Sequence, residues 1–209
     1  MESYTMPNFP ESMNTIHLAL LRNVTNSPKI RRRLIEASKA MGEVGDKLRE
    51  EVDFAFLEAS MLVSRQHLLI AILNTLLSSL PSPDSSSPRT STHNLHSELL
   101  LHLSPNNNIT DSLRHHGLSD HTTSLLVVRL GSPGPSKEIW NKIEHVVRGQ
   151  LVSLDELDRG EIADWHRVDK VYKLKELDTT LRKRGLDHGE VIEKKRGAII
   201  SSLAIKHIT

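Results

Sequence analysis

The sequence predicts an α+β domain in which helices pack on a mixed or antiparallel sheet. Short apolar runs of strand length are interleaved irregularly with longer segments of helical period, whereas a doubly wound fold alternates the two regularly. The 209 residues correspond to one domain, and we find no internal repeat. A chain of this length can bury a sizeable core without disulfides, which agrees with the complete lack of cysteine.

The first part of the chain contains two candidate strands and two candidate helices. Apolar runs of strand length predict strands at Thr15–Leu21 and Phe54–Leu57. A helix is predicted from Ser27, because serine can cap a helix and Pro28 suits its first position. A second helix is predicted over Ser64–Leu77. It is apolar on most sides, so we expect it to be either fully buried or shared between the core and a partner.

Two segments are predicted to be flexible. The first, residues 1–14, contains two prolines and two glutamates and lacks the apolar stretch of a secretory signal. The second, residues 78–93, is rich in serine and proline, and it cannot bury enough apolar surface to offset the entropy of ordering it. Periodic apolar sequence lies on both sides of this insertion. We therefore expect a single domain over residues 15–209 that is interrupted by a disordered loop.

The second part of the chain opens with Leu95–Leu103, whose alternating leucines predict a strand with one apolar face. Asn108 is placed to cap a following helix, and Gly117 to end it in a left-handed conformation. Leu125–Leu130 predicts a buried strand. The remaining predictions are helices over Ile139–Val147, from a capping box at Ser153–Glu156, over Ile162–Tyr172 and over Glu190–Ile208, with loose segments at Gly131–Ser136 and Lys175–Gly189.

The composition argues against several classes of function. Without cysteine the chain has no thiol nucleophile, no cysteine-ligated zinc site and no redox thiol. Its 27 basic and 26 acidic residues give a net charge of +1, so it lacks the broad basic field of a protein that coats DNA. Aromatic residues make up 3%, too few for a series of base-stacking platforms. No apolar run approaches the length of about 18 residues that predicts a membrane span.

The sequence shows no set of residues that would carry catalysis. Nucleophile-elbow, P-loop, dinucleotide-binding and H-E-x-x-H motifs are all missing. Histidines do concentrate between residues 93 and 121, but a metal site needs ligands that converge on one point. Adjacent His115 and His116 would point about 100° apart on a helix. We therefore predict no enzyme activity, no metal and no cofactor, and keep a histidine-dependent metallohydrolase as an alternative.

One part of the chain has a family likeness. The string N-L-H-S-E-L-L-L-H-L-S-P-N-N-N-I starts at Asn94, and L-S-P-N-N-N-I followed by L-R and G occupies Leu103–Gly117. These residues resemble the PRPK-binding protein family, the kinase-binding subunit of the KEOPS (EKC) complex. The likeness extends over about nine-tenths of the chain and includes Leu20–Asn26, Phe54–Leu57, Val63–Leu77, Gly149–Gln150, Val171–Leu174 and Gly197–Ile208.

The resemblance implies a compact α+β domain without catalysis of its own. Such a subunit binds the PRPK-type atypical kinase and, through it, the threonylcarbamoyl-transferase subunit. The complex makes N6-threonylcarbamoyladenosine beside the anticodon of tRNA, and this subunit helps to recruit the tRNA. The resemblance also implies a location in the nucleus and cytoplasm, with a nuclear pool at chromosomes linked to telomere maintenance. The insertion departs from the family, since its only basic residue is Arg89.

The candidate binding residues follow from the residue pattern and the resemblance together. Large exposed apolar patches mark partner sites, so we expect kinase contacts from the two apolar helices, at Leu69, Leu73, Ile199, Ile200 and Leu203. Both helices lying wholly in the core is the alternative. Basic runs could contact an RNA backbone, and the tRNA candidates are Lys29, Arg31, Arg33, Lys194, Lys195 and Arg196. An RNA-binding adaptor that acts without a kinase also stays open.

Overall fold

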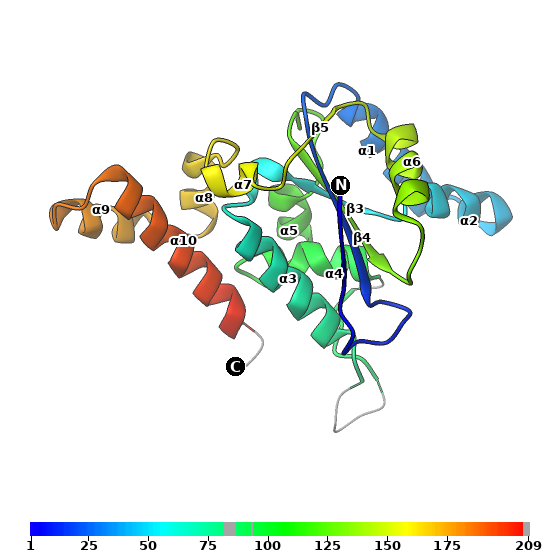
Figure 1. The fold of residues 1–209 in the computed structure, drawn as a ribbon, viewed down its shortest axis with the longest axis horizontal. Coiled ribbons are helices and arrows are strands. Elements are labelled where there is room, and N and C mark those ends of the chain that lie inside the picture. Colours follow the sequence, from blue (N-terminus) through cyan, green and yellow to red (C-terminus); the bar gives the residue numbers. More distant parts are fainter. Residues whose placement is uncertain (82–86, 93, 207–209) are drawn as a thin grey trace.

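The computed structural model contains one five-stranded sheet in which neighbouring strands run antiparallel (Figure 1). β2 (Thr15–Arg22) lies at its centre, and β4 (Leu125–Gly131) lies between β2 and β3 (Ala55–Glu58). The other edge of β2 is shared. β1 (Glu2–Thr5) pairs with its first half and β5 (Gln150–Val152) with its last residues.

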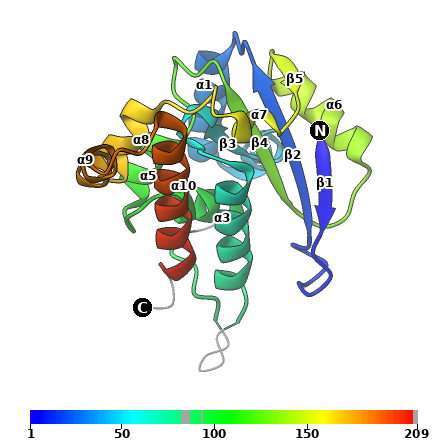
Figure 2. The same ribbon diagram turned by 60° about the vertical axis from the view of Figure 1, so that its left-hand side comes forward.

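Helices cover both faces of the sheet (Figures 1 and 2). On one face, α3 (Arg65–Ser78) and α4 (Leu95–Leu103) bury their leucines against even-numbered residues of β2 and β4, and α5 (Ile109–His116) packs on α4. On the other face, α1 (Ser27–Lys39) and α6 (Ser136–Val146) cover odd-numbered residues of the same strands. Because successive side chains of a strand point to opposite faces, one central strand serves two cores.

A third apolar cluster joins the C-terminal part of the chain to the sheet. It combines the helical turn Ala59–Met61, which follows β3, with α8 (Trp165–Val171) and α10 (His188–Ile205). α10 lies beside α3 in both views (Figures 1 and 2). The remaining helices are α2 (Gly42–Glu51), α7 (Glu156–Arg159) and α9 (Lys175–Lys183).

The structure describes residues 1–81, 87–92 and 94–206. Part of the predicted insertion, residues 82–86 and His93, therefore lies outside the described residues, as do the last residues of the predicted C-terminal helix. The described parts of the insertion are tied together, because the Arg89 N–H donates a hydrogen bond of 2.9 Å to the Ser78 carbonyl. Within the described residues, we find no helix that combines the length and the apolar character needed to cross a membrane.

The α+β class is confirmed, and so are most of the main elements. β2, β3, β4 and α3 begin and end within a residue of their predicted positions. Asn108 caps α5 as predicted, with its side-chain oxygen accepting hydrogen bonds from the N–H groups of Thr110 and Asp111 at 2.9 and 3.2 Å. In α1 the cap position is Asn26 rather than Ser27, whose hydroxyl instead donates to the Thr122 carbonyl.

Leu95–Leu103 was predicted to be a strand, and it is the helix α4. Its leucines recur at the helical spacing of four residues as well as at alternate positions, so the apolar pattern fits both structures. The local cap decides between them. Asn94 accepts a hydrogen bond of 2.8 Å from the Ser97 N–H, which satisfies a donor that the first turn of a helix leaves unpaired.

Other local predictions were also wrong. Residues 1–14 were predicted to be flexible, but Glu2–Thr5 form β1, and Tyr4 packs against the core. Gly117 ends α5 with φ −80°, which is not left-handed. The Ser153 hydroxyl accepts a hydrogen bond from the Asp155 N–H within a turn instead of capping a helix. The expected loose segment Lys175–Gly189 contains α9 and the start of α10, and α2 and β5 were not predicted at all.

Candidate functional site

The outer side of α3 carries a line of leucines that reach the surface. Leu73 and Leu77 are 41% and 51% exposed, and Leu69, one turn before Leu73, is half-buried. The three residues are spaced by four and therefore share one side of the helix. The inner side of α3 is buried against the sheet, namely Leu68, Ala71, Ile72 and Leu76. Large apolar side chains that line up at the surface are typical of a contact site for another protein.

α10 contributes much less apolar surface than the sequence predicted. Ile199 and Leu203 are buried in the third cluster, together with Met61 and Val63. Both side chains belong to the protein's own core and are not available to a partner. Ile200 follows Ile199 by one residue, which turns it about 100° around the helix, and it is half-buried. The structure therefore leaves only Ile200, of the three predicted residues on α10, at the surface.

Direct contacts fix α10 against α3. The Asn74 side chain donates a hydrogen bond of 2.9 Å to the main-chain carbonyl of Leu203. Ile70, on the same side of α3 as Asn74, packs against the cluster that contains Leu203. The two helices lie side by side, and their C-terminal ends point the same way (Figure 2). We call Leu69, Leu73 and Leu77 of α3 together with Ile200 of α10 the α3–α10 surface.

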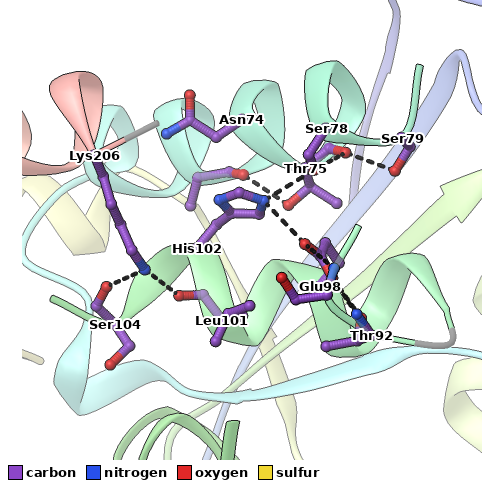
Figure 3. A network of polar contacts seen from close by, with 12 residues as sticks. Asn74, Thr75, Ser78, Ser79, Thr92, Glu98, Leu101, His102, Ser104 and Lys206 are labelled. Carbon is purple, nitrogen blue, oxygen red and sulfur yellow. Dashed lines mark hydrogen bonds and ion pairs between the residues drawn. The ribbon is translucent and has the colours of Figure 1, made fainter. Parts of the chain in front are cut away.

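α4 supports the C-terminal end of α10 from below (Figure 3). The Lys206 ammonium, one residue after α10, donates hydrogen bonds of 2.8 Å to the carbonyls of Leu101 and Ser104 and one of 2.9 Å to that of Asn106. These carbonyls lie at and just beyond the end of α4, where a helix leaves its last acceptors unpaired and favours a positive charge. Lys206 thus joins α10 to α4.

A buried carboxylate on α4 supports the C-terminal end of α3 (Figure 3). Glu98 is 1% exposed, and its Oε1 lies 3.5 Å from His102 Nε2, which in turn is hydrogen-bonded to the Ser78 hydroxyl at 3.0 Å. Thr92 donates to Glu98 from its hydroxyl at 2.6 Å and from its N–H at 2.9 Å. Burial raises the pKa of Glu98, but hydrogen bonds from His102, Thr92 and Ser91 outweigh it and hold the pKa at about 2.

Two histidines meet one tyrosine between α3, α5 and the end of α8. The Tyr172 hydroxyl donates its only proton to the Leu103 carbonyl at 2.5 Å, so it must accept from His67 Nε2 at 3.2 Å and His116 Nε2 at 3.1 Å. Both histidines therefore carry a proton on Nε2. Burial lowers the pKa of His67 to about 4, and burial together with His67 lowers the pKa of His116. The Val63 N–H also donates to His67 Nδ1, whereas His116 Nδ1 is buried without a hydrogen-bond partner among the described residues. The cluster thus joins three parts of the chain.

The basic residues predicted to bind tRNA do not form one site. Lys29 and Arg31 are exposed on α1, and Arg31 is ion-paired with Asp120 at 2.9 Å. The Lys194–Arg196 run lies on α10, at the opposite end of the molecule from α1 (Figure 1). Arg33 is only partly exposed. A continuous basic groove that would include both runs is therefore not present among the residues that the structure describes.

Of the run on α10, Lys194 alone is exposed. Lys195 is 3% exposed, and its ammonium lies 2.8 Å from Asp169 and 2.6 Å from Asp178. Arg196 donates to Glu193 at 2.5 Å and to the Asp158 carbonyl at 2.9 Å. These contacts occupy two of the predicted tRNA residues. The burial of Lys195 could have been predicted from the sequence, because Lys195 is spaced by four residues from Val191 and Ile199 and by eight from Leu203, which are all buried.

Three histidines of the histidine-rich stretch make structural contacts. His96 lies 3.3 Å from Asp53 and accepts from the Leu130 N–H, His102 lies against Glu98, and His116 lies against Tyr172. Among the described ranges, no three histidine, aspartate or glutamate side chains are grouped so that they could hold a metal ion. His93 lies outside these ranges. Sequence reasoning missed the structural roles because they depend on partners distant in the chain.

Comparison with known proteins gives a consistent result. The sequence matches the model of the family described as kinase binding protein CGI-121 over residues 21–207, a range that includes the whole α3–α10 surface. The EKC/KEOPS complex subunit CGI121 of Cryptococcus neoformans is 49% identical over 236 aligned residues, which cover 100% of both chains. The corresponding subunit of Aspergillus fumigatus is 32% identical over 176 residues, 83% of this chain and 84% of the relative. That of Candida albicans is 28% identical over 188 residues, 84% of this chain and 86% of the relative.

Proposed function

Because the chain belongs to the kinase-binding protein CGI-121 family, we propose that it is the non-catalytic subunit of an EKC/KEOPS complex and binds the PRPK-type kinase of that complex through the α3–α10 surface. One observation carries the choice of surface. Leu73 and Leu77 are exposed and Leu69 is half-buried, and the three form an apolar line on a helix whose other side is already buried. Water contact with these leucines costs free energy that a partner would recover by covering them.

The partner chemistry follows from this surface. Its four defining side chains are apolar, so the kinase should meet them with apolar side chains of its own. The tight support from Lys206, Asn74 and Glu98 suits such a contact, because a surface that is held in place before binding loses less conformational entropy when it binds. Ile199 and Leu203 would act indirectly, by holding Ile200 at its place on α10.

The finer parts of the proposal rest on the family. The subunit would reach the threonylcarbamoyl-transferase subunit through the kinase and would help to recruit tRNA for N6-threonylcarbamoyladenosine formation beside the anticodon. Its exposed cations Lys29 and Lys194 support a modest contribution to tRNA contact. We place the protein in the nucleus and cytoplasm, with a nuclear pool at telomeres. We propose no catalytic activity for this subunit.

Capture of the kinase subunit tests the docking surface. Leu73→Asp and Leu77→Asp each put a charge where an apolar contact would form, and hot-spot positions of this kind cost about 2–4 kcal/mol of binding. We expect both variants to lose the purified kinase in a pull-down while they keep the far-ultraviolet spectrum and melting temperature of the parent. Val44→Asp is the matched control, because Val44 is 68% exposed on the distant α2.

The same experiment separates the alternatives. If all three variants hold the kinase as the parent does, the kinase contacts another part of the molecule and the proposed surface is wrong. If the parent retains only tRNA, and RNase removes every other partner, the protein acts as an RNA-binding adaptor without a kinase. A purified complex that contains the kinase after RNase treatment would exclude that reading.

A further inference from the structure

A buried carboxylate binds the two residues Ser91 and Thr92, which lie shortly before α4. Glu98 accepts hydrogen bonds from the Ser91 N–H at 3.2 Å, the Thr92 N–H at 2.9 Å and the Thr92 hydroxyl at 2.6 Å. The carboxylate itself is 1% exposed, whereas Thr92 is half-exposed and Ser91 is exposed. A partly exposed threonine thus has its hydroxyl in contact with a buried negative charge, and the same hydroxyl lies 3.2 Å from the Asn94 carbonyl.

The same carboxylate is linked to the last turn of α3. Glu98 lies against His102, and His102 is hydrogen-bonded to the Ser78 hydroxyl (Figure 3). Ser78 also accepts a main-chain hydrogen bond from Arg89, in the described part of the loop. Leu77 of the α3–α10 surface is the residue just before Ser78. A loop that is released from Glu98 would therefore leave the end of α3 with fewer contacts.

The sequence before Thr92 contains one feature that some protein kinases recognise. Arg89 lies three residues before it in Arg89-Thr90-Ser91-Thr92, a spacing that arginine-directed serine/threonine kinases read, and residues 87–91 lie mostly at the surface. Segments of this composition are common sites of switching by phosphorylation. Thr92 and Ser91 differ in one respect. Only the Thr92 hydroxyl is hydrogen-bonded to Glu98.

We propose that Thr92 is a phosphorylation site and that its phosphorylation releases the loop from Glu98 and weakens kinase docking on the α3–α10 surface, a consequence that rests on the proposed function. In this step the Thr92 oxygen forms a bond to the γ-phosphorus of ATP, the bond from that phosphorus to the β–γ bridging oxygen breaks, and ADP leaves with the electron pair. The hydroxyl proton passes to the base of the modifying kinase. That kinase is an arginine-directed enzyme.

Charge explains the direction of the effect. Phosphorylation removes the hydrogen that Thr92 donates and puts about −1.5 to −2 charges beside Glu98. Glu98 cannot relieve the repulsion by turning to solvent, because it is buried and hydrogen-bonded to the Ser91 and Thr92 N–H groups and faces His102. A phosphate next to a buried carboxylate disrupts rather than orders a segment. The loop therefore leaves the carboxylate instead of tightening on it.

The first experiment treats the purified full chain with Mg-ATP and the catalytic subunit of an arginine-directed kinase, and maps phosphate by peptide mass spectrometry. We expect phosphate on Thr92. The modified protein should melt several degrees lower and show faster amide exchange at Ser91, Thr92 and the last turn of α3. It should also bind its docking partner, the purified PRPK-type kinase subunit, at least about tenfold more weakly. Phosphate found only on other residues, or a Thr92-phosphorylated protein with unchanged exchange and melting, overturns the inference.

Variants test the role of the Glu98 charge. Thr92→Glu should lower the melting temperature more than Thr92→Val, which only removes the hydroxyl, and Ser91→Glu is the matched control one residue away. In a Glu98→Gln background, the additional loss caused by Thr92→Glu should largely vanish, since the repulsion has lost one partner. An equal loss in both backgrounds contradicts the inference. If the unmodified protein does not bind the kinase at all, the proposed function fails, whereas melting and exchange still decide the release of the loop.

Discussion

The side-chain amide of Asn74 donates a hydrogen bond of 2.9 Å to the main-chain carbonyl of Leu203, and this contact joins the two helices of the proposed docking surface. Because the acceptor belongs to the main chain, the bond fixes the backbone of α10 independently of the Leu203 side chain, which packs in the core. Asn74 and Leu203 therefore hold the surface in place, whereas other residues of the two helices would contact a partner. This difference can be tested residue by residue.

Leu203→Ala should destabilise the protein, and Ile200→Glu should weaken kinase binding. Removing the buried Leu203 side chain leaves a cavity and costs about 2–5 kcal/mol of unfolding free energy. Ile200 is half-buried at the surface, so a charge there should cost mainly binding. Urea unfolding and kinase capture measure the two effects. Equal unfolding free energies for Leu203→Ala and the parent would show that α10 does not pack as described.

Asn108→Ala should lower stability by about 1 kcal/mol, the usual value of a helix cap. The Asn108 side chain accepts from two N–H groups at the start of α5, so the loss has a defined cause. Asn107→Ala is the control, since the structure shows no hydrogen bond of that exposed side chain among the described residues. Thermal unfolding of both variants checks this. A loss of tRNA modification at unchanged stability would instead identify Asn108 as a binding residue.

The strands and the long apolar helix could be predicted because their signals are local. Thr15–Leu21 and Leu125–Leu130 are apolar on both faces, as a strand between two helical layers must be. α4 could not be assigned from its leucines alone, since their spacing fits both a strand and a helix. The Asn94 cap, which favours the helix, was the signal that decided between them. Elements that depend on distant partners, such as β1 on β2, carry too few residues to give a signal of their own.

The candidate site was only partly predictable for the same reason. The surface position of Leu69 and Leu73 could be predicted, because α3 has more apolar residues than one buried side can hold. Their contact with a kinase stays a prediction. Lys195 was misjudged, because its neighbours Lys194 and Arg196 make the run look like an exposed charged segment. The two aspartates that bind Lys195 come from α8 and α9, and α9 lies in a segment that was expected to be loose.

Acid should destabilise the protein between about pH 7 and pH 5. His67 and His116 are buried and neutral in the folded chain, and burial lowers the pKa of each, for His67 to about 4. The unfolded chain takes up these protons near pH 6.5 and the folded chain does not, so stability is full above that pH and falls as the pH drops toward 4. For His67 alone the loss at pH 5 is about 2 kcal/mol.

Urea unfolding at pH 7.5 and pH 5 measures this loss. His67→Gln should reduce the pH dependence even if it lowers stability at both values, and His145→Gln, at an exposed position of α6, should leave it unchanged. Glu98 does not interfere in this range. Its pKa is lowered to about 2, so its contribution is lost only as the pH falls below the usual carboxyl value. Equal unfolding free energies at both pH values would contradict the buried, neutral state of the two histidines.

Substitution by alanine should affect stability at Lys195 and tRNA binding at its neighbour Lys194. Lys195→Ala removes the cation that Asp169 and Asp178 share, which should cost about 1–3 kcal/mol of stability without a direct effect on RNA. Lys194→Ala should leave stability unchanged, because Lys194 is exposed, and should make the log–log salt dependence of tRNA binding shallower by about 0.7, the value of one phosphate contact on a single strand. Filter binding across a salt series and urea unfolding of both variants check the two halves of the prediction.

For the parent protein we expect a log–log salt slope of roughly −1.5 to −3, because the exposed cations of α1 and α10 lie at opposite ends of the molecule. A parent slope steeper than about −6 would mean that an extended basic surface forms on binding. A loss of tRNA affinity in Lys195→Ala at full stability would mean that the ion pairs open to let Lys195 reach the RNA.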